Sequence, residues 1–253
     1  MSNEWYDIDS WQWVDNDNAQ WGFVDVFVYG TGLNQIWTDN RYVYAATTSG
    51  LDIINIETEQ RQSFVTNSNG YSSVWSDNEK IFIGSTAGIK FFNQSSIGPS
   101  EMIYFVADYL RIPDITSNNI KYIHGNSNKL ICCTVEGIDI IRRDTGYITH
   151  TIISGAAKCF VTSEYDYYYY TVSGTNSWSL NRLNGNTGDW LLPDMIYTTG
   201  SGFLAGSTRI NDFYVTEHTS VSGAYNTLFV ATDLGVYVYD EGSTEHRCFM
   251  TLS

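Results

Sequence analysis

The sequence predicts an all-β protein made of repeated units of four antiparallel strands. Three observations support this prediction: a Ser/Thr-x-x-Gly motif occurs five times, short runs of β-branched and aromatic residues flank the copies, and Asp, Asn and Gly stand between the runs where turns are needed. The chain has 253 residues, of which 43% are hydrophobic and 16% charged, as is typical of a folded protein. This length suffices for one large β domain.

The motif ends at five glycines, which are Gly50, Gly88, Gly137, Gly174 and Gly235. A Ser or Thr stands three residues before each glycine, at Thr47, Ser85, Thr134, Thr171 and Thr232. The interval between successive glycines averages about 46 residues, which matches four short strands with their turns. Glycine suits a tight turn because, without a Cβ atom, it adopts positive φ angles at little cost. Each motif therefore marks the turn between the second and third strands of a unit.

We name the four strands of each unit a, b, c and d in chain order. Asp and Asn follow the a strand, as in Asp39-Asn40 and Asp77-Asn78, and both residue types favour tight turns. The b strands are expected at residues 42–45, 81–84, 130–133, 167–170 and 228–231. A lone meander of four strands leaves both of its faces uncovered. We therefore expect five units to be arranged radially, each packing against two neighbours.

These units resemble known repeats. Those with Thr-x-x-Gly before an apolar run resemble the two-component-regulator type of β-propeller repeat, and residues 174–190, with Asn186-Thr187-Gly188-Asp189-Trp190, resemble a quinoprotein-type repeat. The resemblance covers about residues 34–253 and implies a single β-propeller of five four-stranded blades, with six blades as the alternative. The tryptophan of the quinoprotein-type unit recurs in no other unit, so no cofactor site carries over and no cofactor is expected.

The N-terminal residues exceed what five units need. Residues 23–29 alternate in polarity like a strand and lie where a d strand would precede residue 34, while residues 247–252 are a candidate d strand for the last blade. We predict that the N- and C-terminal strands pair in one blade, because this closure hides the sheet edges. The chain then divides into an appendage or arm at residues 1–20 and a propeller domain at residues 21–253. Alternatively, N-terminal strands help to form a sixth blade.

The charge of the chain excludes several partners. The sequence has 13 basic and 28 acidic residues and a net charge of −15. Nucleic acids and anionic membranes need a basic surface, so neither is expected to bind. No apolar run approaches the length of about 18 residues that spans a membrane, so no membrane insertion is expected. The first residues lack the basic and apolar regions of a signal peptide, which predicts synthesis in the cytoplasm without export.

No motif of catalytic or metal-binding chemistry is present. The four histidines have no HxxxH or HExxH spacing, and the four cysteines form no C-x-x-C pair. We expect the cysteines to be small buried residues, because a chain of this size needs no disulfides. The sequence thus predicts a protein that is not an enzyme and binds no metal.

Two sets of residues are candidate sites. The longest connections between units fall at residues 94–117 and 189–209 and carry apolar residues that a solvated loop does not need. With the aromatic residues of the N-terminal arm they form a candidate protein interface, whose members are Trp5, Trp11, Trp13, Ile97, Met102, Leu110, Ile112, Leu191, Leu192, Phe203 and Leu204. The alternative is that the loop residues fold back over the blade edges.

The b strand of the fourth unit has tyrosines on both faces. Tyr167, Tyr168, Tyr169 and Tyr170 either fill wide wedges between blades or form an aromatic platform for sugars or a partner side chain. A lectin would repeat such aromatic residues in every blade. Aligned thirteen residues before each glycine, the column that holds Trp37 and Trp75 continues as His124 and Val161, so the repetition fails after two blades.

The favoured function is therefore a non-enzymatic structural or protein-interaction propeller. The acidic, Lys-poor composition, rich in Asn, Ser, Thr and Tyr, is similar to that of virion proteins of tailed phages, which predicts a component of a phage head or tail located in the virion. Its partners would be other proteins within a larger assembly. The alternatives are a glycan-binding, lectin-like propeller and a carbohydrate-active hydrolase or lyase on a propeller scaffold.

Overall fold

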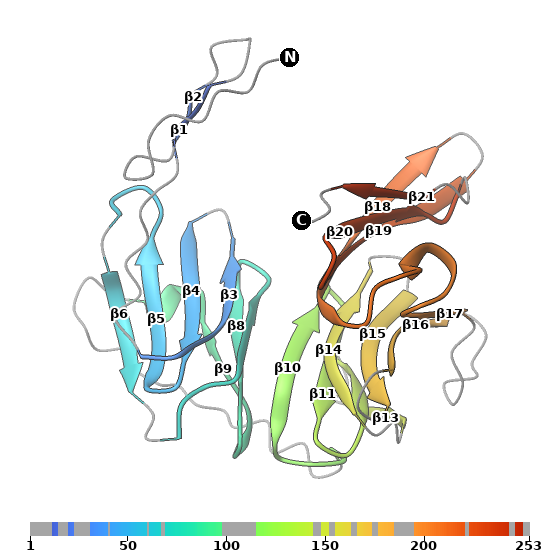
Figure 1. The fold of residues 1–253 in the computed structure, drawn as a ribbon. Helices are drawn as coiled ribbons and strands as arrows, with labels where there is room; N and C mark the ends of the chain where they lie inside the picture. The colour runs from blue at the N-terminus through green and yellow to red at the C-terminus, as the bar shows by residue number, and fades with distance from the viewer. Residues whose placement is uncertain are drawn as a thin grey trace.

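The fold is described from a computed structural model of the chain (Figure 1). The structure describes residues 12–14, 20–22, 31–39, 41–59, 61–66, 69–97, 115–143, 148–151, 155–162, 166–173, 177–184, 195–220, 223–242 and 246–249. Among them the chain forms strands and two short 3-10 helices, η1 (Gln94–Ser96) and η2 (Gly202–Leu204). The predicted all-β class is confirmed.

Consecutive strands form antiparallel sheets of three or four strands, together with one two-stranded ribbon of β1 (Gln12–Val14) and β2 (Gln20–Gly22). The first sheet is formed by β3 (Leu33–Thr38), β4 (Tyr42–Thr47), β5 (Gly50–Asn55) and β6 (Arg61–Thr66). The second sheet is formed by β7 (Ser73–Ser76), β8 (Lys80–Ser85) and β9 (Gly88–Asn93). Residues 98–114, which follow the second sheet, lie outside the described residues.

The third sheet is formed by β10 (Ile120–Gly125), β11 (Lys129–Thr134), β12 (Ile138–Arg142) and β13 (Ile148–Thr151). The fourth sheet is formed by β14 (Ala156–Val161), β15 (Asp166–Ser173), β16 (Ser177–Asn184) and β17 (Met195–Thr198). The fifth sheet is formed by β18 (Ile210–Ser220), β19 (Gly223–Thr232), β20 (Val236–Asp240) and β21 (His246–Phe249). Each sheet is a meander in chain order, as the repeat predicts.

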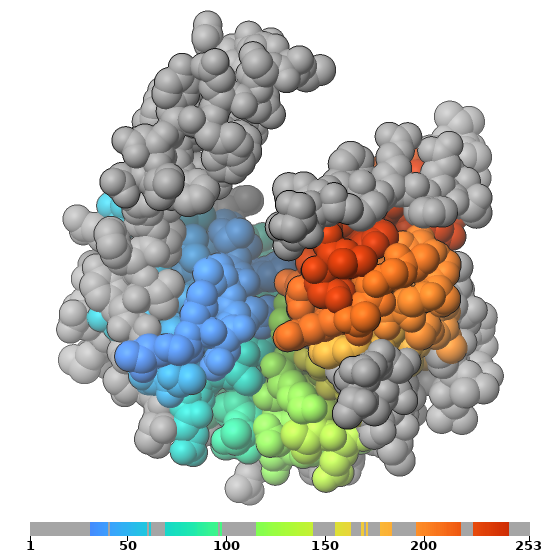
Figure 2. Space-filling model, in the orientation of Figure 1, coloured from blue at the N-terminus to red at the C-terminus, as the bar shows by residue number. Residues whose placement is uncertain are grey.

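The sheets follow one another around an arc in chain order, as the colours of Figures 1 and 2 show. Each sheet packs its face against the next through a cluster of buried apolar side chains. Ile53 and Ile83 lie in the cluster of the first and second sheets, and Ile89 and Ile123 in that of the second and third. Cys133 and Val161 join the third and fourth sheets, and Tyr168 and Val230 join the fourth and fifth. Packing between the sheets thus buries faces that a single meander would expose.

The repeated Ser/Thr-x-x-Gly motif is a turn closed by a side chain. The Thr47 hydroxyl donates to the Gly50 carbonyl at 2.9 Å and accepts the Gly50 amide at 3.1 Å. Thr134 and Gly137 form the same pair of bonds at 3.1 and 3.0 Å. The motif therefore repeats because the hydroxyl satisfies backbone groups that the turn would leave unpaired.

The a–b turns are closed by Asx side chains, as predicted. The Asp39 carboxylate accepts the amides of Arg41 and Tyr42, both at 2.8 Å. Equivalent pairs of bonds reach Asp77, at 3.0 and 2.6 Å, and Asn126, at 2.9 and 2.8 Å. A side chain that accepts two successive amides fixes the turn locally, which explains the recurrence of Asp and Asn.

Gly88→Val is expected to lower the free energy of unfolding by about 1–3 kcal/mol. Gly88 has a φ of +102°, a region that a β-branched residue resists, although its Cβ would make only an ordinary contact, 3.7 Å from Asn118 Oδ1. Urea denaturation measures the change, with Ala87→Val, an exposed position of the same turn, as the control. Equal stability of the two variants would contradict the backbone explanation.

The fourth unit departs from the expected alignment. In the structure the residue that corresponds to Trp37, Trp75 and His124 is Phe160, not Val161, because the connection between β14 and β15 is longer than in the first three units. The fifth unit contributes Tyr214 at the same level. The expected place of Val161 in this column was therefore wrong. The tryptophan does end after two sheets, as expected, but a ring of another kind (His124, Phe160 and Tyr214) continues the column through the remaining three.

The predicted closure of the ring requires the N- and C-terminal strands to pair in one blade. The strand β21 covers part of the predicted last d strand and pairs with β20. The predicted N-terminal strand at residues 23–29 lies outside the described residues. Closure of the ring, the number of blades in it, and the division at residue 20 therefore stay predictions.

Candidate functional site

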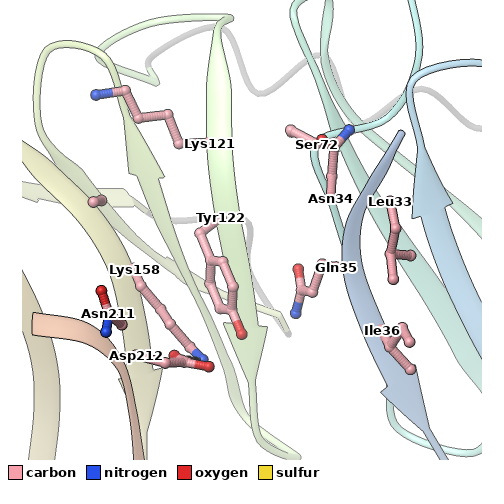
Figure 3. A pocket seen from close by; sticks show the side chains of 11 residues that line it. Leu33, Asn34, Gln35, Ile36, Ser72, Lys121, Tyr122, Lys158, Asn211 and Asp212 are labelled. Carbon is pink, nitrogen blue, oxygen red and sulfur yellow. Dashed lines mark hydrogen bonds and ion pairs between the residues drawn. The ribbon is translucent and has the colours of Figure 1, made fainter. Parts of the chain in front are cut away.

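A cavity of about 570 Å³ lies where the inner strands of the sheets converge (Figure 3). It is lined by the first residues of the a strands, together with Ser72 just before β7. Its members are Leu33, Asn34, Gln35, Ile36, Ser72, Lys121, Tyr122, Ala157, Lys158, Asn211 and Asp212. Because four sheets contribute their first strand and the second sheet contributes the residue before its first strand, the cavity marks the axis around which the sheets are arranged, and we call it the axial pocket.

A β-bulge at the same level of four inner strands shapes the axial pocket. The register shifts between Leu33 and Gln35 in β3, and the same shift recurs in β10, β14 and β18. The additional residues are Asn34, Lys121, Ala157 and Asn211, all of which line the pocket. A bulge residue has no partner in the strand ladder, so its side chain is turned away from the regular pleat.

Gln35 brings an unsatisfied donor to the pocket. The residue is only 8% exposed. The side-chain carbonyl accepts the Val74 amide at 3.1 Å and also the Ser73 hydroxyl. The Nε2 atom has no hydrogen-bond partner, and Figure 3 shows the amide directed toward Tyr122. A buried NH₂ group without an acceptor is costly, so this position favours a ligand that accepts hydrogen bonds.

Charged groups stand on the opposite side of the pocket. Lys158 forms an ion pair with Asp212, and its ammonium lies 5.1 Å from the ring centre of Tyr122. Asp212 also accepts the Phe213 amide at 2.7 Å. Lys121 is exposed at the pocket, from the bulge of β10. Ammonium, carboxylate, amide and phenol groups thus converge on one cavity, a combination typical of sites that recognise polar ligands.

The b–c turns form the rim on this face, because each inner strand begins beside the end of a b strand. Ile120 pairs with Thr134, and the Val135 amide donates to the Asn119 carbonyl at 3.2 Å. Val135 is one of the exposed large apolar side chains. On the fifth sheet the Asp233 carboxylate accepts the Thr208 hydroxyl at 2.6 Å, and this bond holds the pKa of Asp233 below its usual range. The rim therefore combines apolar and anionic groups.

The aromatic column lies one step deeper along the same strand faces. His124 stacks on Phe160 with ring centres 3.9 Å apart and meets Trp37 edge-on at 5.3 Å. Its Nδ1 atom accepts the Val161 amide at 3.2 Å. Burial, and secondarily the charge of Lys158, lower the pKa of His124 to about 3, so the ring is neutral. His124 is thus a core residue rather than an acid or base presented to a ligand.

The structure places the predicted interface residues in different environments. Phe203 and Leu204 are buried in the cluster between the fourth and fifth sheets. The prediction that they lie on an interaction surface was therefore wrong. They lie in η2, which folds the long connection back over the sheet edges. Ile97 is partly buried against the first cluster. Outside the described residues lie Trp5, Trp11, Met102, Leu110, Ile112, Leu191, Leu192 and the side chain of Trp13.

The tyrosines of β15 do not form an exposed platform where they are described. Tyr168 and Tyr169 are buried, the first in the cluster of the fourth and fifth sheets and the second in that of the third and fourth. The side chains of Tyr167 and Tyr170 lie outside the described residues. The alternative that these rings fill the wedges between sheets is therefore correct for Tyr168 and Tyr169. The large rings occupy both faces because the fourth sheet packs on both sides.

A buried polar cluster joins the fourth and fifth sheets around Glu241. Its carboxylate accepts the hydroxyls of Tyr168 and Tyr197, at 2.8 and 3.0 Å, and forms an ion pair with Arg182 at 3.1 Å. Asn226 donates to the Tyr168 oxygen at 2.9 Å. Burial and the adjacent carboxylate raise the pKa of Tyr197, which keeps its hydroxyl a donor. These contacts satisfy the hydrogen-bonding capacity of the carboxylate, so we assign the cluster a role in stability rather than in binding.

Other chemistry is limited in the part of the chain that is described. There, no group of three or more His, Cys, Asp or Glu side chains is placed to hold a metal ion. Cys132, Cys133 and Cys159 are free and buried, which confirms the expectation for these three. Within the described ranges, no helix is both long enough and apolar enough to cross a membrane.

Sequence reasoning missed the axial pocket. The signal was present as polar pairs at the start of three a strands, which are Asn34-Gln35, Ser72-Ser73 and Asn211-Asp212. Two further a strands carry Lys121 and Lys158 near the same level. Alignment on the glycine turns hid this pattern because the a–b connections differ in length. Alignment of the inner strands themselves brings the polar residues into one ring.

No protein-family profile and no curated protein matches the chain. Solved structures do match. The extracellular domain of BT4673, a proposed hybrid two component system of B. thetaiotaomicron, has a TM-score of 0.58 and 15% identity, over 87% of this chain and 30% of that one. The WD40 domain of Toxoplasma gondii coronin has a TM-score of 0.57 and 10% identity, over 86% of this chain and 58% of that one.

Saccharomyces cerevisiae Sqt1 has a TM-score of 0.58 and 13% identity, over 88% of this chain and 63% of that one. This chain thus spans less than two thirds of the length of each of these neighbours. At such low identities the likeness shows the fold alone. The repeated sheets are of the β-propeller type, as the sequence motifs implied.

Proposed function

We propose that this chain is a non-enzymatic binding scaffold whose protein partner inserts a polar group into the axial pocket. The observation that carries the proposal is the unbonded Nε2 atom of the buried Gln35, which faces a cavity lined by inner strands of the sheets. A donor left without an acceptor in a folded protein is a place where a bound acceptor adds stability. An acceptor from a partner, such as a backbone carbonyl or a carboxylate, would satisfy this donor.

The surroundings of the pocket support a protein as the partner. Lys121 and Asn211 add exposed donors across the pocket from Gln35, while the rim carries the exposed side chain of Val135. Apolar rim groups around hydrogen-bonding groups are typical of protein interfaces. The face that carries the pocket is also the face to which the long connections between units lead. The strongly acidic chain, with a net charge of −15, would steer a basic partner toward it.

The finer form of this proposal places the protein in the virion of a tailed phage, as a component of the head or tail. Its support is compositional: few lysines, many Asn, Ser, Thr and Tyr residues, and a large acidic excess. Mass spectrometry of purified particles from the native source tests it directly. Presence in the particle in stoichiometric amount is the expected result, and absence from particles overturns the virion assignment alone.

The contact itself is tested by Lys121→Glu, with Arg41→Glu as the matched control. Both residues are exposed and both changes replace a cation by an anion, but Arg41 lies in an a–b turn at the far ends of the strands. Crosslinking mass spectrometry in the native source should recover the same partner with the wild type and with Arg41→Glu. Lys121→Glu should reduce that crosslinked product at least tenfold.

Equal recovery of the partner with both variants would contradict the pocket as the contact site. A glycan array with the wild-type protein separates the glycan-binding alternative. Binding there that Lys121→Glu abolishes would replace the protein partner with a sugar, whereas an array without hits removes that alternative.

A further inference from the structure

The first sheet exposes apolar side chains that its counterparts bury. Leu33 and Ile36 of β3 are 51% and 49% exposed. Their register equivalents on β10, β14 and β18 are almost completely buried; they are Ile120, Ile123, Ala156, Cys159, Ile210 and Phe213. Each of these pairs packs against the sheet that precedes it. Leu33 and Ile36 therefore lie on the face where a preceding sheet belongs.

The fifth sheet shows the complementary feature. Tyr214 is 54% exposed, whereas its register equivalents Trp75 and Phe160 are buried. Trp75 lies in the cluster of the second and third sheets, and Phe160 in that of the fourth and fifth, so both face the sheet that follows. Tyr214 thus lies on the face where a following sheet belongs. Among the described residues, four clusters join consecutive sheets and none joins the fifth sheet to the first.

We propose that the N-terminal residues 1–30 occupy this break and act as a partial extra blade between the fifth and first sheets. Residues 31 and 32 connect the segment to β3. In the same way, residues 152–155 connect β13, the d strand of the third unit, to β14, the a strand of the fourth. It already contains an antiparallel ribbon, β1 and β2, in which Trp13 is paired with Trp21 in register. Its remaining residues include the alternating run 23–29.

The length of the segment suits this role. Thirty residues reach about 100 Å when extended, so two or three short strands fit with their turns. Covering Leu33, Ile36 and Tyr214 removes apolar surface from water, which stabilises the closed form. Trp5, Trp11 and Trp13 then belong to the core of the ring rather than to a partner-seeking arm.

Photocrosslinking in the full-length protein tests the proposal. A benzoylphenylalanine at position 36 should crosslink to a peptide within residues 1–30 of the same chain. The same probe at position 196, which replaces the exposed Ile196 of β17, is the control and should give no such product. Mixing isotope-labelled and unlabelled protein separates crosslinks within one chain from those between two chains.

Three results would overturn the proposal. A product between position 36 and residues 210–249 would show that the ring closes without the segment. A mixed-isotope product would show that a second copy covers the face. A lack of any product at position 36 would show that nothing covers it. As a second readout, Ile36→Asp should lower the melting temperature by about 5 °C or more, whereas Ile196→Asp should leave it nearly unchanged. Ile36 also lines the axial pocket, so both readouts are made on the purified protein without a partner, which keeps them separate from the proposed function.

Discussion

Replacing Glu241 by glutamine is expected to lower the free energy of unfolding by about 3–5 kcal/mol. The Glu241 and Arg182 side chains are only 7% and 18% exposed, so a largely buried cation would lose this counter-charge. Tyr168 and Tyr197 also donate to this carboxylate, and a glutamine would bring two more donors into a site that already holds donors. Urea denaturation at neutral pH measures the loss.

Asp212→Asn is the matched control for Glu241→Gln. Asp212 also forms an ion pair, with Lys158, but its side chain is 58% exposed. Water screens such a pair, so the expected cost is about 1 kcal/mol or less. Similar losses in the two variants would mean that the Glu241 cluster is not the buried joint between the fourth and fifth sheets.

Acidification is expected to destabilise the protein through His124. Its pKa is about 3 in the folded state, against about 6.5 in the unfolded chain, so between these values the unfolded state binds a proton that the folded state does not. Stability is therefore full above pH 6.5 and is lost as the pH falls toward 3. Two pH units below 6.5, at pH 4.5, the loss attributable to His124 is about 2.7 kcal/mol.

His124→Phe should remove this part of the pH dependence. Phenylalanine fits the aromatic column and retains the stack on Phe160, while the Val161 amide loses its acceptor, at a cost of about 1 kcal/mol at all pH values. Urea denaturation of both proteins at pH 7 and at pH 4.5 gives the comparison, and replacement of the exposed His218 by Gln serves as control. The prediction is wrong if His124→Phe and the wild type lose the same stability between the two pH values.

Local turn chemistry explains why so much of the fold could be predicted. The Thr47 hydroxyl and the Asp39 carboxylate close their turns with bonds to residues two or three positions away, so their effect is readable in the sequence. The b strands lie where the apolar runs predict them. The fourth unit was misaligned because one longer connection shifts every a-strand residue by one position, and a single shift moves a side chain to the other face.

The site was harder to predict than the fold because it is built from residues far apart in the chain. Gln35, Tyr122 and Lys158 meet only after the sheets are arranged around the axis. Nothing local distinguishes Gln35 from a surface glutamine. Likewise, Phe203 and Leu204 stand in a sequence of loop character, and only the packing of η2 on the fifth sheet shows that they are core residues.

The bulges at the axis assign ligand contact and strand pairing to different residues. Asn34, Lys121, Ala157 and Asn211 line the pocket but take no part in the strand ladders. A substitution at Lys121, Ala157 or Asn211 changes the chemistry offered to a ligand, while the strand ladders keep their hydrogen bonds and register. Asn34 differs, because its side chain also donates to the Tyr71 carbonyl at 2.7 Å. The chemical variety of these four residues, from amide to ammonium to methyl, agrees with such freedom. Specificity for a new ligand is thus accessible by point changes at the bulges, with the frame left intact.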